Sequence, residues 1–276
     1  MVMNAPAIEV SDVCCIFGSQ TVLSNVSLHV SAGETVAIVG ESGCGKSVTM
    51  KVMMQLLRPT SGTLKWFGTD VETLSTDKRQ QQRLRLGYLF QGAALFDSLT
   101  IYENVAFGMR QTGEQNEQQI RQTVLERLDE VGLSPDIVKK KPSEISGGMQ
   151  KRVGLARALS LSPDVMFYDE PTTGLDPVNS RRIDDLIHSV RQSRGVTGII
   201  VTHDLRTVQR VADRVVMLYP RYKLNEDAGQ IIFDGSLQEL AASSDKRVHE
   251  YIGDEFDTNL TRNVEVEHRQ PLLKST

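Results

Sequence analysis

The sequence predicts an α/β fold built on a mostly parallel β-sheet. Apolar runs typical of buried strands alternate with stretches of helical periodicity along most of the chain. One strand-like run, Thr35–Val39, leads through a glycine-rich loop into a predicted helix from Lys46 to Leu57. Because strands that alternate with helices usually pair in parallel, these two observations favour a twisted sheet covered by helices.

The remaining elements follow from the same patterns. Near the N-terminus, two runs joined across Gly18-Ser19-Gln20 are predicted as antiparallel strands, Ile8–Val13 and Val22–Val30. Later strands are predicted at Leu86–Phe90, Val165–Tyr168, Gly198–Thr202 and Val215–Leu218. Helices are predicted at Val178–Ser193 and Leu205–Val211.

A helical insert interrupts this α/β pattern. Within Glu114–Val131, apolar residues recur at helical spacing on one face: Ile120, Val124, Leu125, Leu128 and Val131. We therefore expect an N-terminal part of the core with an antiparallel β subdomain at 1–91, a helical subdomain at 92–161 and a C-terminal part of the core at 162–252. Residues 253–276 lose periodicity and are expected to form a tail or an arm.

Composition excludes several classes of protein. The 276 residues carry 31 Lys and Arg against 35 Asp and Glu, a net charge of −4, which disfavours a nucleic-acid partner. The three cysteines do not support a disulfide framework or a metal site, which fits a reducing compartment such as the cytosol. The sequence contains no run of about 20 predominantly apolar residues, so we expect any membrane association to occur through a partner.

The glycine-rich loop has the layout of a phosphate-binding loop. Its eight residues match the pattern G-x-x-x-x-G-K-[ST]: Gly40, Glu41, Ser42, Gly43, Cys44, Gly45, Lys46 and Ser47. Glycines let successive backbone N–H groups surround phosphate oxygens, and the following helix contributes its positive end. Lys46 is predicted to reach the β- and γ-phosphates, and the Ser47 hydroxyl to ligate Mg²⁺. A chance glycine turn is the alternative.

Two acids end an apolar run at Asp169 and Glu170. Buried strands of α/β proteins deliver functional groups at their carboxyl ends, and successive side chains point to opposite sides. Asp169 is therefore a candidate for the Mg²⁺ shell and Glu170 for polarising an attacking water. Taken alone, the pair would be a strand followed by solvated acids.

A second anion-binding helix start is predicted at Ser146, Gly147 and Gly148. Ser146 suits an N-cap, and the two glycines leave backbone N–H groups open in front of a helix predicted from Lys151 to Leu161. An ordinary capped helix start is the alternative.

The order of these motifs resembles that of ABC-type ATPases, a family of P-loop NTPases. Six motifs match in turn: Gly40–Ser47, Gln91, Ser146–Gly148, Asp169–Glu170, Gly174–Asp176 and His203. The resemblance covers roughly residues 6–240. The signature departs from the commonest pattern at Ile145 and Met149, which leaves its serine and glycines in place.

The resemblance implies ATP and Mg²⁺ as cofactors and a head-to-tail pair of subunits. Ser146, Gly147 and Gly148 would then face the γ-phosphate bound by the second copy, and Asp176 would lie in the neighbouring D-loop. Glu170 matches the general base, His203 a γ-phosphate contact, and Gln91 a ligand of Mg²⁺ and water. Phe17 matches the aromatic that stacks on adenine. The alternatives are a core aromatic for Phe17, a core histidine for His203 and a loop glutamine for Gln91.

A narrower resemblance concerns Phe90–Thr100 and Glu103–Ala106, which are similar to the ATPases of Mla-type lipid transporters. It implies an ATPase on the cytoplasmic face of the inner membrane that moves phospholipid, held by a permease. An MCE-domain protein and a STAS-domain subunit are further implied partners. Ala93–Phe96 is then a socket for a permease helix or, alternatively, core of the insert. Another substrate, such as an amino acid or a metal, remains an alternative, and a non-transport role on nucleic acid or the ribosome is disfavoured.

Overall fold

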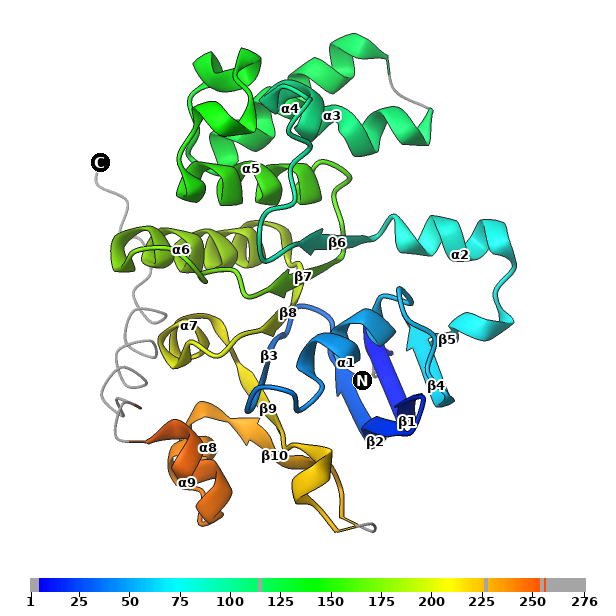
Figure 1. The fold of residues 1–276 in the computed structure, drawn as a ribbon. Helices are drawn as coiled ribbons and strands as arrows, with labels where there is room; N and C mark the ends of the chain where they lie inside the picture. Colours follow the sequence, from blue (N-terminus) through cyan, green and yellow to red (C-terminus); the bar gives the residue numbers. More distant parts are fainter. Residues whose placement is uncertain (1–4, 114–115, 226–227, 254–255, 257–276) are drawn as a thin grey trace, which may run out of the picture.

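The computed structural model describes residues 5–113, 116–225, 228–253 and 256. Figure 1 shows them in three parts: a large sheet with flanking helices, a smaller sheet beside it, and a layer of helices above both. The large sheet has the order β10-β9-β3-β8-β7-β6. All its neighbours pair in parallel except β10 with β9, so the predicted α/β fold is confirmed.

The strands of the large sheet bring the predicted site motifs to one edge. The carboxyl ends of β3, β7 and β8 carry the glycine-rich loop, the two acids and the histidine. In chain order the strands are β3 (Thr35–Val39), β6 (Leu86–Leu89), β7 (Val165–Asp169), β8 (Thr197–Val201), β9 (Arg214–Leu218) and β10 (Ile231–Ser236). β10 was not predicted from the sequence.

The smaller sheet is antiparallel, in the order β2-β1-β4-β5. Its strands are β1 (Ile8–Phe17), β2 (Gln20–Val30), β4 (Ser61–Trp66) and β5 (Thr69–Asp70). The predicted hairpin is confirmed, whereas β4 and β5 were not predicted. Gly62 (φ +94°) permits the close pairing of β4 with β1, because a Cβ there would lie 2.6 Å from the Asp12 carbonyl oxygen.

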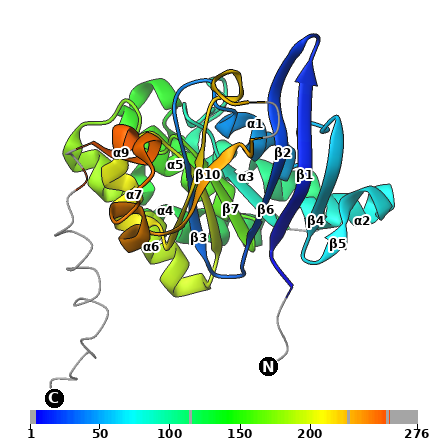
Figure 2. The ribbon, with the colours of Figure 1, turned by 90° about the horizontal axis from the view of Figure 1, so that it is seen from below.

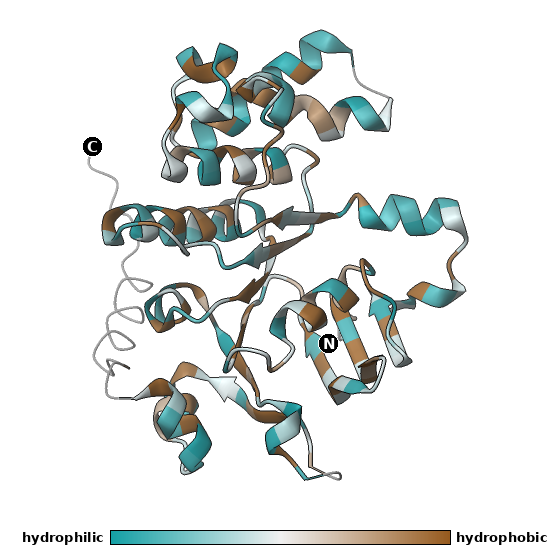
Figure 3. Cartoon of the chain, in the orientation of Figure 1, coloured by the Kyte–Doolittle hydropathy of each residue, from teal (hydrophilic) through white to brown (hydrophobic). Residues whose placement is uncertain are grey.

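Nine α-helices complete the described part of the chain. They are α1 (Lys46–Met53), α2 (Thr76–Arg83), α3 (Ile101–Thr112), α4 (Glu117–Glu130), α5 (Gly147–Leu159), α6 (Pro177–Arg194), α7 (Leu205–Val211), α8 (Leu237–Ala241) and α9 (Lys246–Ile252). Short 3₁₀ turns lie at Val71–Thr73, Pro135–Lys139, Pro142–Glu144 and Arg221–Lys223, the last labelled η4. Figure 3 shows that α2 is hydrophilic around its whole circumference, and it buries no residue.

Two helix boundaries differ from the prediction by four residues. α1 ends at Met53 rather than Leu57, because Gln55 takes a positive φ of 53° and the backbone N–H of Leu57 turns back to the Lys51 carbonyl. α5 begins at Gly147 rather than Lys151, since the capping hydroxyl lies at Ser146.

The helical layer lies within residues 92–161, and its core is continuous with one face of the large sheet. α3, which was not predicted, packs with α4 and α5 around Val105, Met109, Val124 and Leu128. Both α3 and α4 begin with reciprocal capping boxes, which satisfy the first free N–H groups of each helix.

The two faces of β3 pack against different partners. Val36 and Ile38 join the core shared with the small sheet and α1, whereas Ala37 and Val39 face α7 and α9. Figure 2 shows α7 and α9 on the side of the large sheet opposite the small one. Among the described residues, no helix combines the length and apolar character needed to cross a bilayer. The predicted tail falls largely outside the described residues, which there include only Gly253 and Phe256.

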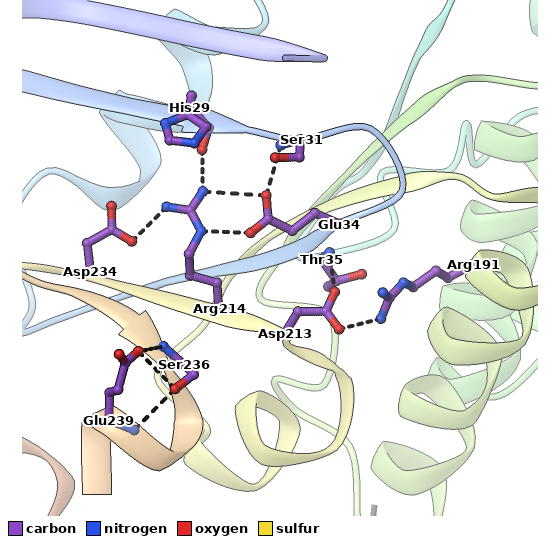
Figure 4. Close-up of polar contacts among 10 residues, drawn as sticks. All are labelled: His29, Ser31, Glu34, Thr35, Arg191, Asp213, Arg214, Asp234, Ser236 and Glu239. Carbon is purple, nitrogen blue, oxygen red and sulfur yellow. Dashed lines mark hydrogen bonds and ion pairs between the residues drawn. The ribbon is translucent and has the colours of Figure 1, made fainter. Parts of the chain in front are cut away.

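Arg214 fastens the large sheet to the small one (Figure 4). Its guanidinium donates to Glu34 (2.7 Å), to Asp234 (2.6 Å) and to the His29 backbone carbonyl at the end of β2. Although burial alone would raise it, the pKa of Glu34 is held below its ordinary value by hydrogen bonds from Arg214 and from the Ser31 backbone N–H. The network fixes how the antiparallel sheet sits beside the phosphate loop.

Candidate nucleotide-binding site

The glycine-rich loop joins β3 to α1 and needs its glycines for space. Gly40 (φ +140°) has no room for a side chain, because a Cβ would lie 2.1 Å from the Leu218 carbonyl oxygen. At Gly45 (φ +100°) a Cβ would lie 2.5 Å from Leu23 Cδ2. Gly43 also has a positive φ, and nothing lies within 4 Å of its Cβ position, so an oxygen-rich ligand can approach the backbone there.

Lys46 is held over this loop. Its Nζ donates to the backbone carbonyls of Gly40 (2.6 Å) and Glu41 (3.0 Å). The loop therefore presents an ammonium group beside open backbone at the start of α1, where the helix dipole also favours an anion. The open backbone of the glycine-rich loop and the Lys46 ammonium together fit the phosphates of a nucleotide.

Asp169 ends β7 beside the phosphate-loop edge. Its carboxylate accepts a hydrogen bond of 2.8 Å from the Tyr88 hydroxyl on β6, and burial together with Asp169 raises the pKa of Tyr88. Among the described residues, no group of three or more His, Cys, Asp and Glu side chains could hold a metal ion. A nucleotide-bound Mg²⁺ needs only one or two protein ligands, because phosphates and waters supply the others. Ser47 and Asp169 fit that limited role.

Glu170 has a strained backbone and several polar partners. Its φ is +48°, and its backbone N–H donates to the Val201 carbonyl across the sheet. Its carboxylate accepts hydrogen bonds from the hydroxyls of Thr173 (3.0 Å) and Thr202 (3.3 Å) and lies 2.9 Å from His203 Nδ1. A carboxylate fixed in this way can accept a proton at a defined place.

The other predicted residues have clear placements. His203 is 66% exposed in its side chain and Phe17 is 46% exposed, so the core alternatives for both are wrong. Gln91 is exposed in the turn that follows β6. The structure brings Glu170 and His203 together and leaves Phe17 at the end of β1.

The signature residues begin α5 in the helical layer (Figure 1). The Ser146 hydroxyl accepts a hydrogen bond from the Met149 backbone N–H (3.3 Å), and Gly147 has nothing within 4 Å of its Cβ position. Gly148 lies against Asn179, whose side chain donates to Asp176. Asp176 also caps α6, and N–H groups of Asn179 and Val178 hold the pKa of this carboxylate below its ordinary value. Asn179 of α6 therefore lies between the signature glycine and the D-loop aspartate within one chain.

Three residues near the site were not predicted. Tyr88 positions Asp169, and the buried Lys151 on α5 donates to the Glu170 backbone carbonyl (3.1 Å). Burial lowers the pKa of Lys151, with Glu170 and Asp169 acting in the opposite direction. The Tyr251 hydroxyl is buried, lies near the Gly40 backbone N–H of the phosphate loop, and belongs to a residue that lines a hollow with His203. All three come from distant segments and belong to no local motif.

The sequence profile described as ABC transporter matches residues 23–173. The chain belongs to the ABC transporter family. In Mycobacterium leprae, a probable ribonucleotide transport ATP-binding protein, mkl, is 42% identical over 216 residues, which cover 78% of this ABC protein and 62% of that one. This chain thus spans less than two thirds of that relative.

Other relatives match the ABC protein over more of their length. The intermembrane phospholipid transport system ATP-binding protein MlaF of Haemophilus influenzae is 36% identical over 255 residues, covering 92% of this chain and 93% of that one. A solved ATP-binding cassette, dimeric and bound to ADP and Pi in a post-hydrolysis state, aligns with a TM-score of 0.72 at 28% identity. That alignment covers 83% of this chain and 98% of the other.

Proposed function

We propose that this chain is the ATP-hydrolysing motor subunit of a membrane ABC transporter. The observation that carries the proposal is the pair Glu170 and His203, 2.9 Å apart, at the sheet edge that also holds the phosphate loop. A general base beside a triphosphate site suits in-line attack of water on the γ-phosphate.

Each side chain then has one task. Lys46 and the loop N–H groups bind the β- and γ-phosphates, Glu170 accepts the proton of the attacking water, and His203 orients that water and the γ-phosphate. Mg²⁺, held by Ser47, Gln91 and Asp169, would neutralise phosphate charge. Phe17 would stack on the adenine.

The pair of phosphate-facing helix starts supports a head-to-tail dimer. Ser146, Gly147 and Gly148 would face the nucleotide held by a second copy, with Asp176 beside them. The solved cassette that this chain resembles is itself dimeric. ATP binding would close the dimer and hydrolysis would release it, which a permease experiences as alternating access.

A rigid, partly apolar segment after β6 supports docking of a permease. Arg157 donates to the carbonyls of Ala93 (2.6 Å) and Ala94 (2.7 Å), and the buried Asn104 holds the turn at Phe96. The rings of Phe96 and Phe107 pack at a tilt of 41° with centroids 4.7 Å apart, and they remain 43% and 38% exposed. Ala93 itself is buried, so the segment packs partly into the core while Phe96 and Phe107 form an exposed aromatic surface beside it.

Phospholipid is the proposed substrate, supported by the near-complete match to a phospholipid transport ATPase. An MCE-domain protein and a STAS-domain subunit are proposed partners, and the cytoplasmic face of the inner membrane is the proposed location. The 42% identity to a ribonucleotide transport protein favours a second candidate, a motor of the same kind serving another solute.

Affinity purification of the full-length chain from its native membranes, with mass spectrometry of partners and lipids, tests both the transporter assignment and the phospholipid assignment. A permease with an MCE-domain protein and phospholipid supports the proposal. A permease with a soluble solute-binding protein overturns the lipid assignment alone. Phe96→Asp is expected to lose the permease while Leu84→Asp, at an exposed site directly after α2, retains it. Recovery of ribosomes or nucleic acid in place of a permease would contradict the transporter assignment.

A further inference from the structure

The connection between β9 and β10 lies against the phosphate loop. Residues 219–224, which contain η4, form what we call the 219–224 segment. Lys223 Nζ lies 2.5 Å from Glu41 Oε2, the second residue of the phosphate loop. The segment therefore contacts the motif that binds the triphosphate.

A hollow of about 380 Å³ separates this segment from the β1–β2 hairpin. One wall comes from Gln20, Thr21 and Val22, the other from Arg221 and Tyr222, and Gly43 of the phosphate loop lies between them. A ligand whose phosphates rest on that loop would place its remaining part in this hollow.

The 219–224 segment is held in place by its own contacts. The Arg221 guanidinium donates to the carbonyls of Leu224 (3.1 Å) and Asn225 (2.8 Å). The Tyr219 ring lies near two cations, 5.6 Å from Lys223 Nζ and 5.4 Å from the Arg247 guanidinium carbon. These contacts hold the wall in one position, and a wall held in this way loses less entropy when a ligand binds.

Two exposed aromatic rings belong to this region. Tyr222 is 76% exposed, the highest value among the exposed large hydrophobic side chains described, and Phe17 is 46% exposed. Phe17 pairs in register with Gln20, which lines the hollow. Every nucleobase has a flat π-face that stacks on aromatic side chains, so a hollow lined by Tyr222, with Phe17 at the end of the neighbouring strand β1, suits a base.

We propose that the 219–224 segment is a second wall of the nucleobase site and that Tyr222 covers a purine held against Phe17. Tyr222 is thus a specificity-determining residue, because a purine offers it a larger stacking face than a pyrimidine. The inference rests on the proposed function, since it requires a nucleoside triphosphate on the loop that contains Lys46.

Isothermal titration of the full-length chain with ATP and with CTP tests this. In the wild-type chain we expect tighter binding of ATP than of CTP. Tyr222→Ala should weaken ATP binding about tenfold and CTP binding less, so the preference for ATP narrows. Tyr222→Phe should restore both affinities, because the ring rather than the hydroxyl does the stacking. Leu84→Ala, which removes an exposed apolar side chain directly after α2, is the control and should leave both affinities unchanged.

Three outcomes would overturn the inference. Equal losses for ATP and CTP would mean that Tyr222 acts through the phosphate loop and not through the base. An unchanged ATP affinity in Tyr222→Ala would mean that the 219–224 segment does not contact the base. If Tyr222→Ala loses binding to phosphatidylglycerol vesicles while its nucleotide affinity stays intact, the segment contacts a lipid surface and not a base. Failure of the wild-type chain to bind ATP would instead refute the proposed function.

Discussion

His203 Nδ1 lies 2.9 Å from a carboxylate oxygen of Glu170, although β8 and the whole of α6 separate them in sequence. Parallel pairing of β7 with β8 places the ends of these strands side by side, so Glu170 follows one strand and His203 the next. The imidazole and the carboxylate therefore orient each other. A hydrolytic site needs this preorganisation, because reorientation during the reaction would add to the barrier.

Glu170→Gln should bind ATP and stall in the closed dimer. The amide keeps the shape of the side chain but cannot accept a proton, so turnover should fall by about 10²-fold or more. Phosphate release and size-exclusion chromatography with ATP measure the two effects. Glu250→Gln, an exposed acid on α9, is the control. If Glu170→Gln turns over ATP near the wild-type rate, Glu170 is not the general base.

Lys46→Ala should lose nucleotide affinity by about 10²-fold, because the ammonium is a charge-assisted donor to two phosphates. Titration with ATP and with ADP measures the loss. Lys51→Ala, an exposed lysine on the same helix, controls for the change in net charge. If Lys46→Ala retains wild-type affinity, the loop is not the phosphate site.

Tyr88→Phe should raise the Mg²⁺ concentration needed for ATP hydrolysis by about tenfold. The lost hydroxyl donates to Asp169, and the partners that orient a metal-site carboxylate typically change metal affinity by about 10–100-fold. Tyr102→Phe removes a similar hydroxyl–carboxylate bond, to Glu117 in the helical layer, and should leave the Mg²⁺ dependence unchanged. Equal Mg²⁺ titration curves for Tyr88→Phe and wild type would show that the hydrogen bond from Tyr88 to Asp169 does not affect Mg²⁺ affinity.

Arg214→Met should lower the free energy of unfolding by about 1–3 kcal/mol, since it leaves Glu34 and Asp234 without their shared partner. Urea denaturation at pH 7 measures the change. Arg58→Met breaks an ion pair whose side chains are 76% and 45% exposed, so it should cost less than about 1 kcal/mol. Similar losses for the two variants would contradict a special role for Arg214.

The stability that Glu34 contributes should depend on pH. Because the pKa of Glu34 is lowered in the folded chain, its contribution is complete above the unfolded pKa of about 4.3 and disappears as the pH falls through the folded value. The gap in unfolding free energy between wild type and Arg214→Met should therefore narrow below about pH 4. A gap that stays constant from pH 7 to pH 3 would assign it to packing of the arginine stem.

Local sequence patterns predicted much of the fold. Continuous apolar runs at Thr35–Val39 and in the segments that became β7, β8 and β9 predicted four strands, and their alternation with helices predicted parallel pairing. α7 has the predicted bounds, Leu205–Val211. The sequence did not predict β4, β5 or α3. The exposed N-terminal half of β4, and Gly108 with the polar C-terminal turn of α3, weaken their periodicity, and tertiary pairing decides such segments.

The same division applies to the site. The sequence by itself determined the phosphate loop, the acids and the signature, because glycine spacing and a strand that ends in carboxylates are local patterns. Only the tertiary structure brought Tyr88 to Asp169, Lys151 to Glu170 and Lys223 to Glu41. These contacts join residues from separate elements, and the sheet order and packing that bring them together are set by burial across the whole chain and not by neighbours in sequence.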